Sequence, residues 1–460
     1  MNKPLTIGHI TDLHARRSIY GSSSIVARRS RAMSELLNHA LAHFKARAVD
    51  LIVVTGDLVD VPTFILEPND YYHMPVAPWL PLVEADYRQI KALLDNAGIP
   101  YVVLPGNHDY EPLMWQVFDR SCNVVDIQAG TSDTPYRVAR FCDREWEGHV
   151  PRRFDRERKR WLELLADKQS PPQIHLQHYV ITPAVASSYP HNYLEAEELL
   201  CRTIATEQVV LSLAGHYHRG SELQKIGNTY FAVGPAFSEF PHPIRIYEVT
   251  PEQVTMETIP LWTEPHNAGR RVVFLDRDGV INDLPSYHTG PEAMHLIPGA
   301  AEALLTLKQA GYAVIVITNQ SAVGAGYTSP RIVDMVHERM CQLLVEATGD
   351  PTAQPDAIFY AIGAGSRAVQ PKWVDQSTNK PSPQMLQQAQ SLLGLNPNGA
   401  WMVGDRLSDL EAALAFGATP ILVRTGDGQE TEGELGAAGL APIAICDNLP
   451  AAVRHILQEQ

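Results

Sequence analysis

The 460-residue sequence has few cysteines and no long hydrophobic run. Its five cysteines are widely spaced and form no CxxC pair, which argues against a disulfide framework and favours reduced thiols in a cytoplasmic setting. No apolar stretch approaches the roughly 20 residues that are needed to cross a bilayer. The first apolar stretch is short and carries His9 and Asp12, which is not the pattern of a signal peptide. We therefore expect a cytoplasmic protein with no membrane partner.

The sequence also lacks an excess of basic residues. It has 37 Lys and Arg against 52 Asp and Glu, for a formal net charge of −15. Because nucleic-acid backbones are bound by basic faces, a nucleic-acid duplex is not expected as the main ligand. A small-molecule phosphate ester remains compatible with this charge, since bound cations reverse the local potential. The oligomeric state is not indicated by the sequence.

Short apolar runs alternate with amphipathic helical patterns along the chain, which is typical of layered α/β folds. In the first part, strands are expected at Leu51–Thr55, Tyr101–Pro105, Ile174–Gln177 and Val209–Ala214, and helices at Met33–Ala48, Asp86–Ala97 and Glu157–Lys168. In the second part, strands are expected at Val272–Leu275, Ala313–Ile317, Ala357–Ala361, Trp401–Val403 and Pro420–Val423, and helices at Gly299–Ala310, Ser329–Thr348, Ser382–Leu393 and Asp409–Phe416. Between them, Leu261–Gly269 contains Pro, Asn and Gly and indicates a linker. We therefore predict two domains, over residues 1–264 and 270–460.

Two further segments have a less specific pattern. The charge run Arg152–Arg160 interleaves acids with bases, which favours the solvated start of a helix over a binding patch. The segment Tyr71–Pro81, which is rich in Tyr and Pro and contains Trp79, is either an ordinary surface loop or a lining of the substrate mouth.

In the first domain, the strand-like apolar segment at the N-terminus and each of the four expected strands are followed by residues of the kind that bind metals. These residues are Asp12, His14, Asp57, Asn107, His108, Asp109, His178, His216 and His218. In open α/β sheets ligands bind beyond the carboxyl ends of the strands, so we expect these side chains to meet on one rim. Their oxygen and nitrogen atoms suit Mn, Fe or Zn.

The number of these residues fits a pair of metal ions, which can clamp a phosphate and activate a bridging water. Asp57 is the natural bridging carboxylate. Each ion is expected to have three further ligands of its own. These are Asp12, His14 and His218 for one ion, and Asn107, His178 and His216 for the other.

The ordered motifs DxH, GD, GNHD, H and GHxH resemble those of the calcineurin-like metallophosphoesterases, and most closely the class III cyclic nucleotide phosphodiesterases. The resemblance covers about Pro4–Trp262 and implies a four-layer α/β/β/α sandwich. It also implies that His108 is no metal ligand but protonates the leaving alkoxide, with Asp109 orienting it.

A second set of polar residues follows the strands of the C-terminal part. It comprises Asp276, Asp278, Thr318, Asn319, Lys380, Asp405 and Asp409. Asp276 and Asp278 are spaced i, i+2 at a strand end, so the first can attack phosphorus and the second can shuttle a proton. Thr318 and Asn319 offer a hydroxyl and an amide to phosphate oxygens, and Lys380 can neutralise the transferring group.

These residues form four motifs in order: Asp276 with Asp278, Thr318 with Asn319, Lys380 alone, and Asp405 with Asp409. Together they resemble the motifs of the haloacid dehalogenase superfamily, in the branch of histidinol-phosphate and heptose-bisphosphate phosphatases. The resemblance covers about Arg271–Gln460 and implies a Rossmann-like domain with Mg held by Asp276, Asp278, Asp405 and Asp409. The spacing from Asp276 to Thr318 leaves no room for a large cap. The zinc loop of that branch has no counterpart, because Ile362–Asn379 contains neither Cys nor His. This departure puts the heptose or histidinol substrate in doubt.

The sequence thus predicts a bifunctional hydrolase with two divalent or transition metal ions (Mn, Fe or Zn) in the first domain and Mg in the second. The first domain would cleave a phosphodiester to a monoester, and the second would release phosphate from it. Two alternatives stay open: the domains act on unrelated substrates, or the chain senses a phosphorylated ligand.

Overall fold

The computed structural model describes residues 3–67, 74–121, 123–129, 135–264, 269–283 and 290–459. The chain forms two compact units that are interleaved in sequence. Unit 1 comprises Met1–Ile19, Arg28–Val61 and Ala77–Thr263, and unit 2 comprises Tyr20–Ala27, Pro62–Val76 and Glu264–Gln460. Part of the predicted linker, residues 265–268, lies outside the described residues. The domain limits 1–264 and 270–460 stay a prediction.

Unit 1 is built on two large sheets. The five-stranded sheet has the order β13(Val254–Pro260)-β12(Pro243–Val249)-β1(Leu5–Ile10)-β2(Leu51–Thr55)-β3(Tyr101–Leu104). The six-stranded sheet has the order β10(Gln224–Ile226)-β11(Thr229–Val233)-β9(Val209–Ala214)-β8(Gln173–Leu176)-β5(Tyr136–Arg140)-β4(Val124–Ile127). A separate hairpin pairs β6(Arg144–Trp146) with β7(Val150–Arg152). The helices are α1(Met33–Ala46), α3(Leu80–Ala97), α4(Glu111–Val117), α5(Asp155–Ala166) and α6(Ala196–Ala205).

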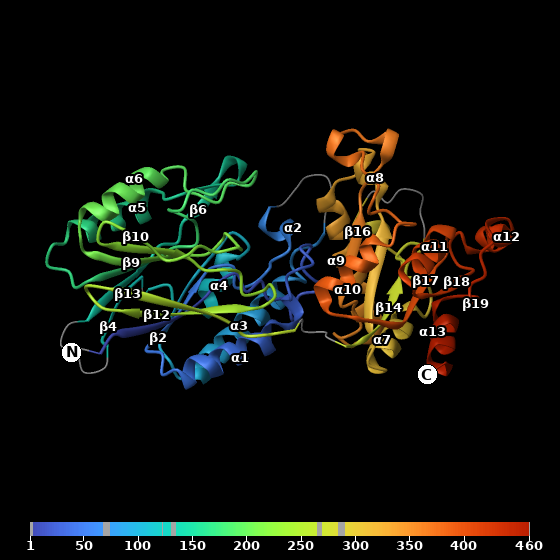
Figure 1. Ribbon diagram of the computed structural model, residues 1–460, viewed down its shortest axis with the longest axis horizontal. Helices are drawn as coiled ribbons and strands as arrows, with labels where there is room; N and C mark the ends of the chain where they lie inside the picture. The colour runs from blue at the N-terminus through green and yellow to red at the C-terminus, as the bar shows by residue number, and fades with distance from the viewer. Residues whose placement is uncertain are drawn as a thin grey trace. The chain divides into compact units, whose positions relative to one another are not determined.

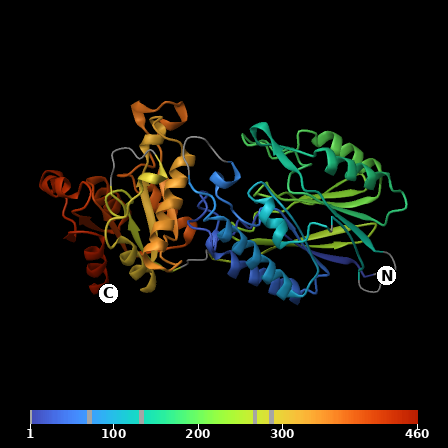
Figure 2. The same cartoon turned by 180° about the vertical axis from the view of Figure 1, so that it is seen from behind.

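The two sheets of unit 1 pack face to face. Their shared core includes Ile7 and Val53 from the first sheet with Ile174 and Leu211 from the second. Helices α1 and α3 cover the outer face of the first sheet, and α5 and α6 cover the outer face of the second (Figure 1). The same four layers are visible from behind (Figure 2). Unit 1 is therefore the α/β/β/α sandwich that the sequence predicted.

Unit 2 contains one parallel six-stranded sheet. Its order is β16(Ala357–Ala361)-β15(Ala313–Asn319)-β14(Arg271–Leu275)-β17(Asn396–Gly404)-β18(Thr419–Val423)-β19(Ala444–Cys446). The helices are α2(Thr63–Leu66), α7(Ala300–Gln309), α8(Ser321–Gly324), α9(Pro330–Thr348), α10(Gln384–Leu393), α11(Leu407–Phe416), α12(Gly428–Ala438) and α13(Leu449–Gln458). In the described part of the stretch from β14 to α7, the one regular element is the short 3-10 helix η3(Pro291–Ala293), so no large cap is seen there.

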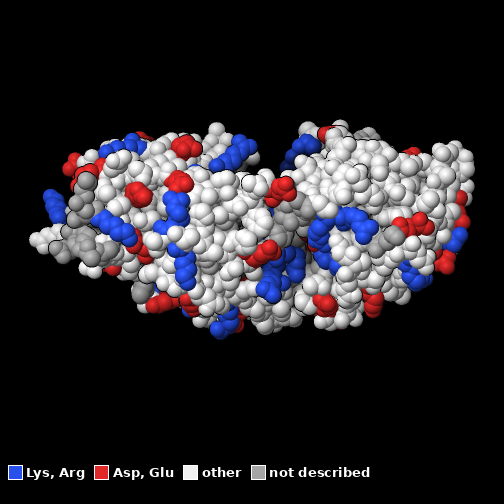
Figure 3. All heavy atoms as spheres, turned by 60° about the horizontal axis from the view of Figure 1, so that its bottom comes forward, with Lys and Arg blue, Asp and Glu red and all other residues white. Residues whose placement is uncertain are grey.

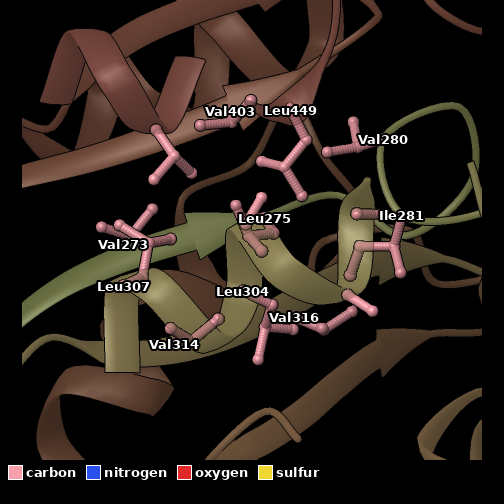
Figure 4. Close-up of a cluster of buried hydrophobic side chains, with 14 of the residues drawn as sticks. Val273, Leu275, Val280, Ile281, Leu304, Leu307, Val314, Val316, Val403 and Leu449 are labelled. Carbon is pink, nitrogen blue, oxygen red and sulfur yellow. The ribbon is translucent and has the colours of Figure 1, made fainter. Parts of the chain in front are cut away.

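Hydrophobic cores lie on both faces of this sheet. On one face, Val273 and Leu275 of β14 pack with Leu304 of α7 and Leu449 of α13 (Figure 4). The other face packs against α10 and α11. Since both faces are covered, the strands are continuous apolar runs, as expected for a parallel sheet.

The strands found from apolar runs mostly agree with the structure, and the differences are local. The limits of β2, β9 and β16 match the prediction, whereas β17 starts five residues earlier than the predicted Trp401. Helix α3 begins at Leu80 rather than Asp86, because Pro81 is tolerated in a first helical turn. Trp79 at its start is fully buried, so this residue does not line a substrate mouth. Residues 71–73 of the same segment lie outside the described residues.

The charge run at Arg152–Arg160 belongs to two elements. Its first residue ends β7, and the helix α5 starts at Asp155.

On the face drawn in Figure 3, acidic and basic side chains are both present on each unit. Among the described residues, no helix combines the length and the apolar character that a membrane crossing requires.

A buried ion pair anchors the β6–β7 hairpin to unit 1. Asp143 accepts hydrogen bonds from Arg153 (Nη2 at 2.8 Å) and from the Tyr193 hydroxyl (2.5 Å), and both ionic side chains are fully buried. We expect Asp143→Ala to lower the free energy of unfolding by about 3–5 kcal/mol, because it leaves a buried guanidinium without its partner. Urea denaturation measures this loss. Glu84→Ala, which removes the exposed pair with Arg88, is the control and should change stability by less than about 0.5 kcal/mol.

Candidate active sites

The first metal-ligand group of unit 1 forms at the ends of β1 and β9. The ligand atoms of Asp12, His14 and His218 all lie within 4.8 Å of one another. His218 turns Nε2 toward Asp12 Oδ1 (3.5 Å), while its Nδ1 lies 2.6 Å from Glu239 Oε1. A carboxylate behind the imidazole fixes the ring and its tautomer, as behind many metal-binding histidines. Glu239 was missed at the sequence level, because it is remote from every motif.

The second group lies beside the first. The ligand atoms of Asp57, His178 and His216 again lie within 4.8 Å of one another. His178 donates from Nδ1 to the carbonyl oxygen of Thr55 (2.7 Å), which leaves Nε2 facing Asn107 Oδ1 (3.2 Å) and Asp57 Oδ2 (3.4 Å). The structure therefore brings together all seven predicted ligands of this domain.

Asp57 lies between the two groups. Its Oδ2 is 3.5 Å from His14 Nε2 and 3.4 Å from His178 Nε2, so one oxygen faces a histidine from each set. Its other oxygen accepts the His108 backbone N–H at 2.8 Å. A side chain at Gly106 would place a Cβ atom 2.2 Å from Asp57 Oδ1, so the GNHD turn needs glycine there. This position fits a bridging ligand.

Four ligand residues have positive φ angles, which is uncommon for residues other than glycine. They are Asp12 (54°), His14 (47°), Asp57 (53°) and His216 (68°). Such conformations cost of order 1–3 kcal/mol each and cluster at functional sites, where the surrounding structure holds them.

The pKa values of the histidines at this site are compatible with cation binding. Burial lowers the pKa of His14 and of His216 well below the ordinary value, so both imidazoles are in the neutral, ligating form. Burial opposes protonation of His178 as well, but Asp57 raises the pKa of His178 to about 9. Cation binding at His178 therefore releases a proton.

Unpaired nitrogen atoms of the predicted histidine ligands also fit metal ions. Among the described residues, Nε2 of His14 and Nε2 of His216 are buried without a hydrogen-bond partner, while Nδ1 of His14 faces Asp60 Oδ1 at 3.6 Å. Unpaired buried polar atoms are costly, and here they lie among carboxylates. A pair of divalent cations would satisfy these atoms.

His108 has a carboxylate partner that differs from the predicted one. Its Nδ1 lies 2.8 Å from Asp60 Oδ1, and its side chain is 29% exposed. Burial opposes the ionisation of Asp60, but Arg16 (3.2 Å) and the nearby histidines hold its pKa well below the ordinary value. An ionised Asp60 thus orients the His108 ring, one nitrogen of which also lies within 4.8 Å of ligand atoms of His14 and Asp57. The sequence signal that could have identified Asp60 is its position as an acidic residue three places after Asp57.

Asp109 does not orient His108, which corrects the sequence expectation. Its carboxylate accepts the backbone N–H groups of Leu58, Val59 and Gly106, and the hydroxyl of Tyr87 at 3.0 Å. It therefore ties the GNHD turn to the loop that follows β2. Burial and nearby Asp57 raise the pKa of Asp109 to about 7.

We expect His108→Ala to retain metal and to lower diester cleavage by about 10²–10⁴-fold, because a general acid contributes that much. The defect should shrink for p-nitrophenol esters, whose leaving group needs little protonation. Asp60→Asn should show the same dependence on the leaving group. Steady-state kinetics with a good and a poor leaving group, beside metal analysis, measure this. An equal loss for both leaving groups would contradict the acid role.

The C-terminal site gathers three carboxylates and a lysine. The ligand atoms of Asp276, Asp405 and Asp409 lie within 4.8 Å of one another. Lys380 places Nζ 2.8 Å from Asp276 Oδ1 and 2.5 Å from Asp409 Oδ1, and also donates to the Ile317 carbonyl oxygen. Burial disfavours a charged lysine, but the two carboxylates raise the pKa of Lys380 to about 12. Lys380 is therefore a cation beside Asp276.

This site also fits a cation. Burial, with the neighbouring carboxylates, raises the pKa of Asp405 to about 8, and within the part of the chain that the structure describes Asp405 Oδ1 is buried without a hydrogen-bond partner. Gly279 has φ +83°, and a Cβ atom there would lie 2.1 Å from Asp405 Oδ2, so the DRDG turn requires glycine. A hard divalent cation such as Mg is satisfied by such oxygen ligands.

The carboxylate of Asp278 lies outside this group of ligands, so the structure does not support it as a side-chain metal ligand. It accepts hydrogen bonds from Arg277 (Nε 3.0 Å, Nη2 2.8 Å), Asn282 (3.1 Å) and Gln320 (3.0 Å). Burial opposes ionisation of Asp278, but Arg277 and the two amides lower its pKa to about 2. Arg277 in turn contacts His337 Nε2 at 3.1 Å, and neither residue was singled out from the sequence.

Thr318 and Asn319 lie at the end of β15, as expected, but their side chains are used differently. Asn319 binds the backbone of Lys380 at both ends of its amide, accepting from N and donating to O at 2.9 Å each. It therefore positions the lysine and is not directed at phosphate. The Thr318 hydroxyl contacts Gln320 Nε2 at 3.0 Å.

The loop Ile362–Asn379, which contains neither Cys nor His, is held at its ends by the amide of Asn379. Asn379 is buried and donates to the carbonyl oxygen of Gly363 at 2.9 Å, which joins the two ends of the loop next to Lys380.

Comparisons with known proteins support both predicted domain families. The family described as calcineurin-like phosphoesterase matches residues 5–220, and the family described as HAD-hydrolase-like matches residues 377–452. D-glycero-β-D-manno-heptose-1,7-bisphosphate 7-phosphatase of Pseudomonas aeruginosa is 36% identical over 192 residues, which cover 41% of this chain and 99% of the relative. The enzyme of the same name from Bordetella bronchiseptica is 32% identical over 193 residues, with the same shares.

Two solved structures were also similar. The B. bronchiseptica D,D-heptose 1,7-bisphosphate phosphatase, complexed with magnesium and phosphate, is 30% identical and covers 41% of this chain and 99% of its own, with a TM-score of 0.36. A dimetal phosphatase from Danio rerio is 15% identical and covers 56% of this chain and 97% of its own, with a TM-score of 0.43.

The chain therefore belongs to the phosphate-ester hydrolases, with a calcineurin-like phosphoesterase domain followed by a HAD-like hydrolase domain. Both domains imply the use of divalent metal ions.

Proposed function

We propose that the chain is a bifunctional hydrolase, in which residues 1–264 cleave a phosphodiester and residues 270–460 release phosphate from a monoester. One observation carries the proposal: the catalytic side chains of both constellations are assembled in a single chain. The sequential order of the two reactions rests on the covalent fusion alone.

In the N-terminal domain, Asp12, His14 and His218 would hold one cation, and Asn107, His178 and His216 the other, with Asp57 between them. Such ions supply activation of water and neutralisation of the phosphate charge. His108 donates a proton from Nε2 to the leaving alkoxide. Asp60 holds Nδ1 of the same ring, so that Nε2 faces the substrate.

In the C-terminal domain, Asp276 attacks phosphorus and forms a phosphoaspartate, while the ester bond to the leaving alcohol breaks. Lys380, 2.8 Å from this nucleophile, offsets the negative charge of the phosphoryl group. Asp278, which Arg277 keeps ionised at rest, takes up a proton from solvent, passes it to the leaving oxygen and then takes one from the water that hydrolyses the phosphoaspartate. Asp276, Asp405 and Asp409 would hold Mg, which supplies charge neutralisation.

The relatives favour a sugar phosphate as the substrate of the C-terminal domain, since they are named as heptose-bisphosphate phosphatases and are matched over nearly their whole length. The same observation supports a second candidate, in which the two domains act on unrelated substrates.

A substrate screen tests the proposed function. Cyclic nucleotides, glycerophosphodiesters and sugar phosphates would be offered to the purified chain with Mn and Mg, while diester loss and free phosphate are followed. We expect at least one diester and one monoester to be hydrolysed. Hydrolysis of neither, together with no bound transition metal, would favour a ligand-sensing role.

A further inference from the structure

A wall of aromatic and imidazole rings adjoins the metal-ligand groups of unit 1. The rings of Tyr189 and His191 lie 5.6 Å and 5.3 Å from the ring of the ligand His216, and His191 is 5.2 Å from Tyr217. Tyr189 and His191 come from the loop between β8 and α6, which also contains His178. Neither of these two residues belongs to a motif of the sequence.

The ring of Tyr189 is held in place at its far end. Its hydroxyl donates to Glu145 Oε1 at 2.9 Å, and the other oxygen of Glu145 lies 2.9 Å from His149 Nδ1. The His149 ring also stacks on Tyr189, with centroids 6.0 Å apart and an interplanar angle of 26°. Glu145 and His149 belong to the β6–β7 hairpin, which the buried pair beneath it anchors.

The loop itself is closed by its own polar groups. The Asn192 side chain accepts from the Val185 N–H at 2.8 Å and donates to the Pro183 carbonyl oxygen at 2.9 Å. His191 donates from Nδ1 to the Tyr189 carbonyl oxygen at 2.9 Å, and among the described residues no hydrogen-bond partner of its Nε2 is found. The wall is therefore preorganised, which lowers the entropic cost of holding a ligand against it.

Tyr189 is nevertheless 36% exposed. A tyrosine whose ring contacts a predicted metal ligand, whose hydroxyl is fixed and whose side chain is partly exposed is suited to hold a flat group. An aromatic pair contributes about 0.5–1.5 kcal/mol beyond the burial of its area. An aliphatic group of the same size is stabilised only by the burial of its apolar area, without this additional aromatic contribution.

We propose that Tyr189 is a specificity-determining residue of the diesterase site, and that it selects phosphate esters whose alcohol carries a planar aromatic group. His191 lies beside it and offers Nε2 to a polar atom of the same ligand. This inference rests on the proposed diesterase function and specifies its substrate class.

Two inhibitors of similar shape isolate the aromatic contribution. Phenylphosphonate and cyclohexylphosphonate carry a C–P bond that neither domain hydrolyses, and they differ in the planarity and π-electrons of one ring. Inhibition would be measured on the full-length protein with Mn, with bis(4-nitrophenyl) phosphate as the substrate. We expect phenylphosphonate to inhibit wild type about 2- to 12-fold more tightly than its saturated counterpart, as the aromatic term predicts.

Tyr189→Leu should abolish this preference while keeping the metal content, and Tyr189→Phe should retain it, because the ring is kept. Tyr327→Leu is the matched control, since it makes the same replacement at a solvent-exposed tyrosine of unit 2. Equal inhibition of wild type by the two phosphonates would overturn the proposal, even if the leucine variant does not fold. An undiminished preference in a folded Tyr189→Leu protein would overturn it too. If wild type does not hydrolyse the diester at all, the proposed diesterase function fails instead.

Discussion

Asp57→Asn is expected to abolish diester cleavage and to leave the C-terminal phosphatase activity intact. The same carboxylate oxygen of Asp57 faces His14 at 3.5 Å and His178 at 3.4 Å, so one substitution affects both metal-ligand groups. An amide retains the shape of the side chain but removes the negative charge between two cations. If this costs about 4 kcal/mol of transition-state stabilisation, the rate of diester cleavage falls roughly 10³-fold.

Metal analysis of the purified protein supplies a readout that does not depend on the substrate. Wild type should contain about two transition-metal ions per chain, as a two-metal site requires, and Asp57→Asn should contain fewer. Asp126→Asn is a suitable control, because Asp126 pairs with Arg137 at the surface, away from the predicted ligands. Full diesterase activity in the Asp57 variant would refute the bridging assignment.

The strand-end positions of the ligands were predictable from the sequence, because the parallel strands were recognisable as apolar runs. Polar residues that follow such strands meet at one edge of a sheet. Asp12, Asp57 and His216 were found in this way, and so were Asp276 and Asp405.

The partners of these residues were harder to predict, because they depend on tertiary contacts that have no period in the sequence. Asp60 rather than Asp109 orients His108, although Asp109 is its neighbour in the chain. Glu239, which lies in another loop, contacts His218. The Asn319 amide is hydrogen-bonded to the backbone of Lys380, although it was expected to bind phosphate oxygens.

The pairing of edge strands was also not apparent from local pattern. Strand β12 pairs antiparallel with β1, and β13 pairs antiparallel with β12 at the edge of the sheet. The burial of β13 does not alternate regularly along the strand. Similarly, the assignment of Tyr20–Ala27 to unit 2 rests on contacts such as the hydrogen bond from Gly21 N to Gln354 Oε1 at 2.7 Å. A bond between residues so far apart in sequence leaves no local signal.

The sequential model makes a second prediction with a large effect. An Asp276→Asn protein should convert the true diester to a monoester and release almost no phosphate, because an amide cannot form the phosphoaspartate. An Asp57→Asn protein should leave the diester untouched but dephosphorylate added monoester. Diester, monoester and free phosphate would be quantified together over time.

Mixing the two variants should restore phosphate release from the diester, because each supplies the reaction that the other lacks. Covalent linkage raises the local concentration of the intermediate, so wild type can exceed the mixture in rate. The model does not require this excess, since the intermediate can diffuse between molecules. It does require chemical identity between the product of the N-terminal domain and the substrate of the C-terminal domain. A best diester whose monoester the Asp57→Asn protein ignores would show that the domains act on unrelated substrates, and the fusion would then need an explanation other than substrate transfer.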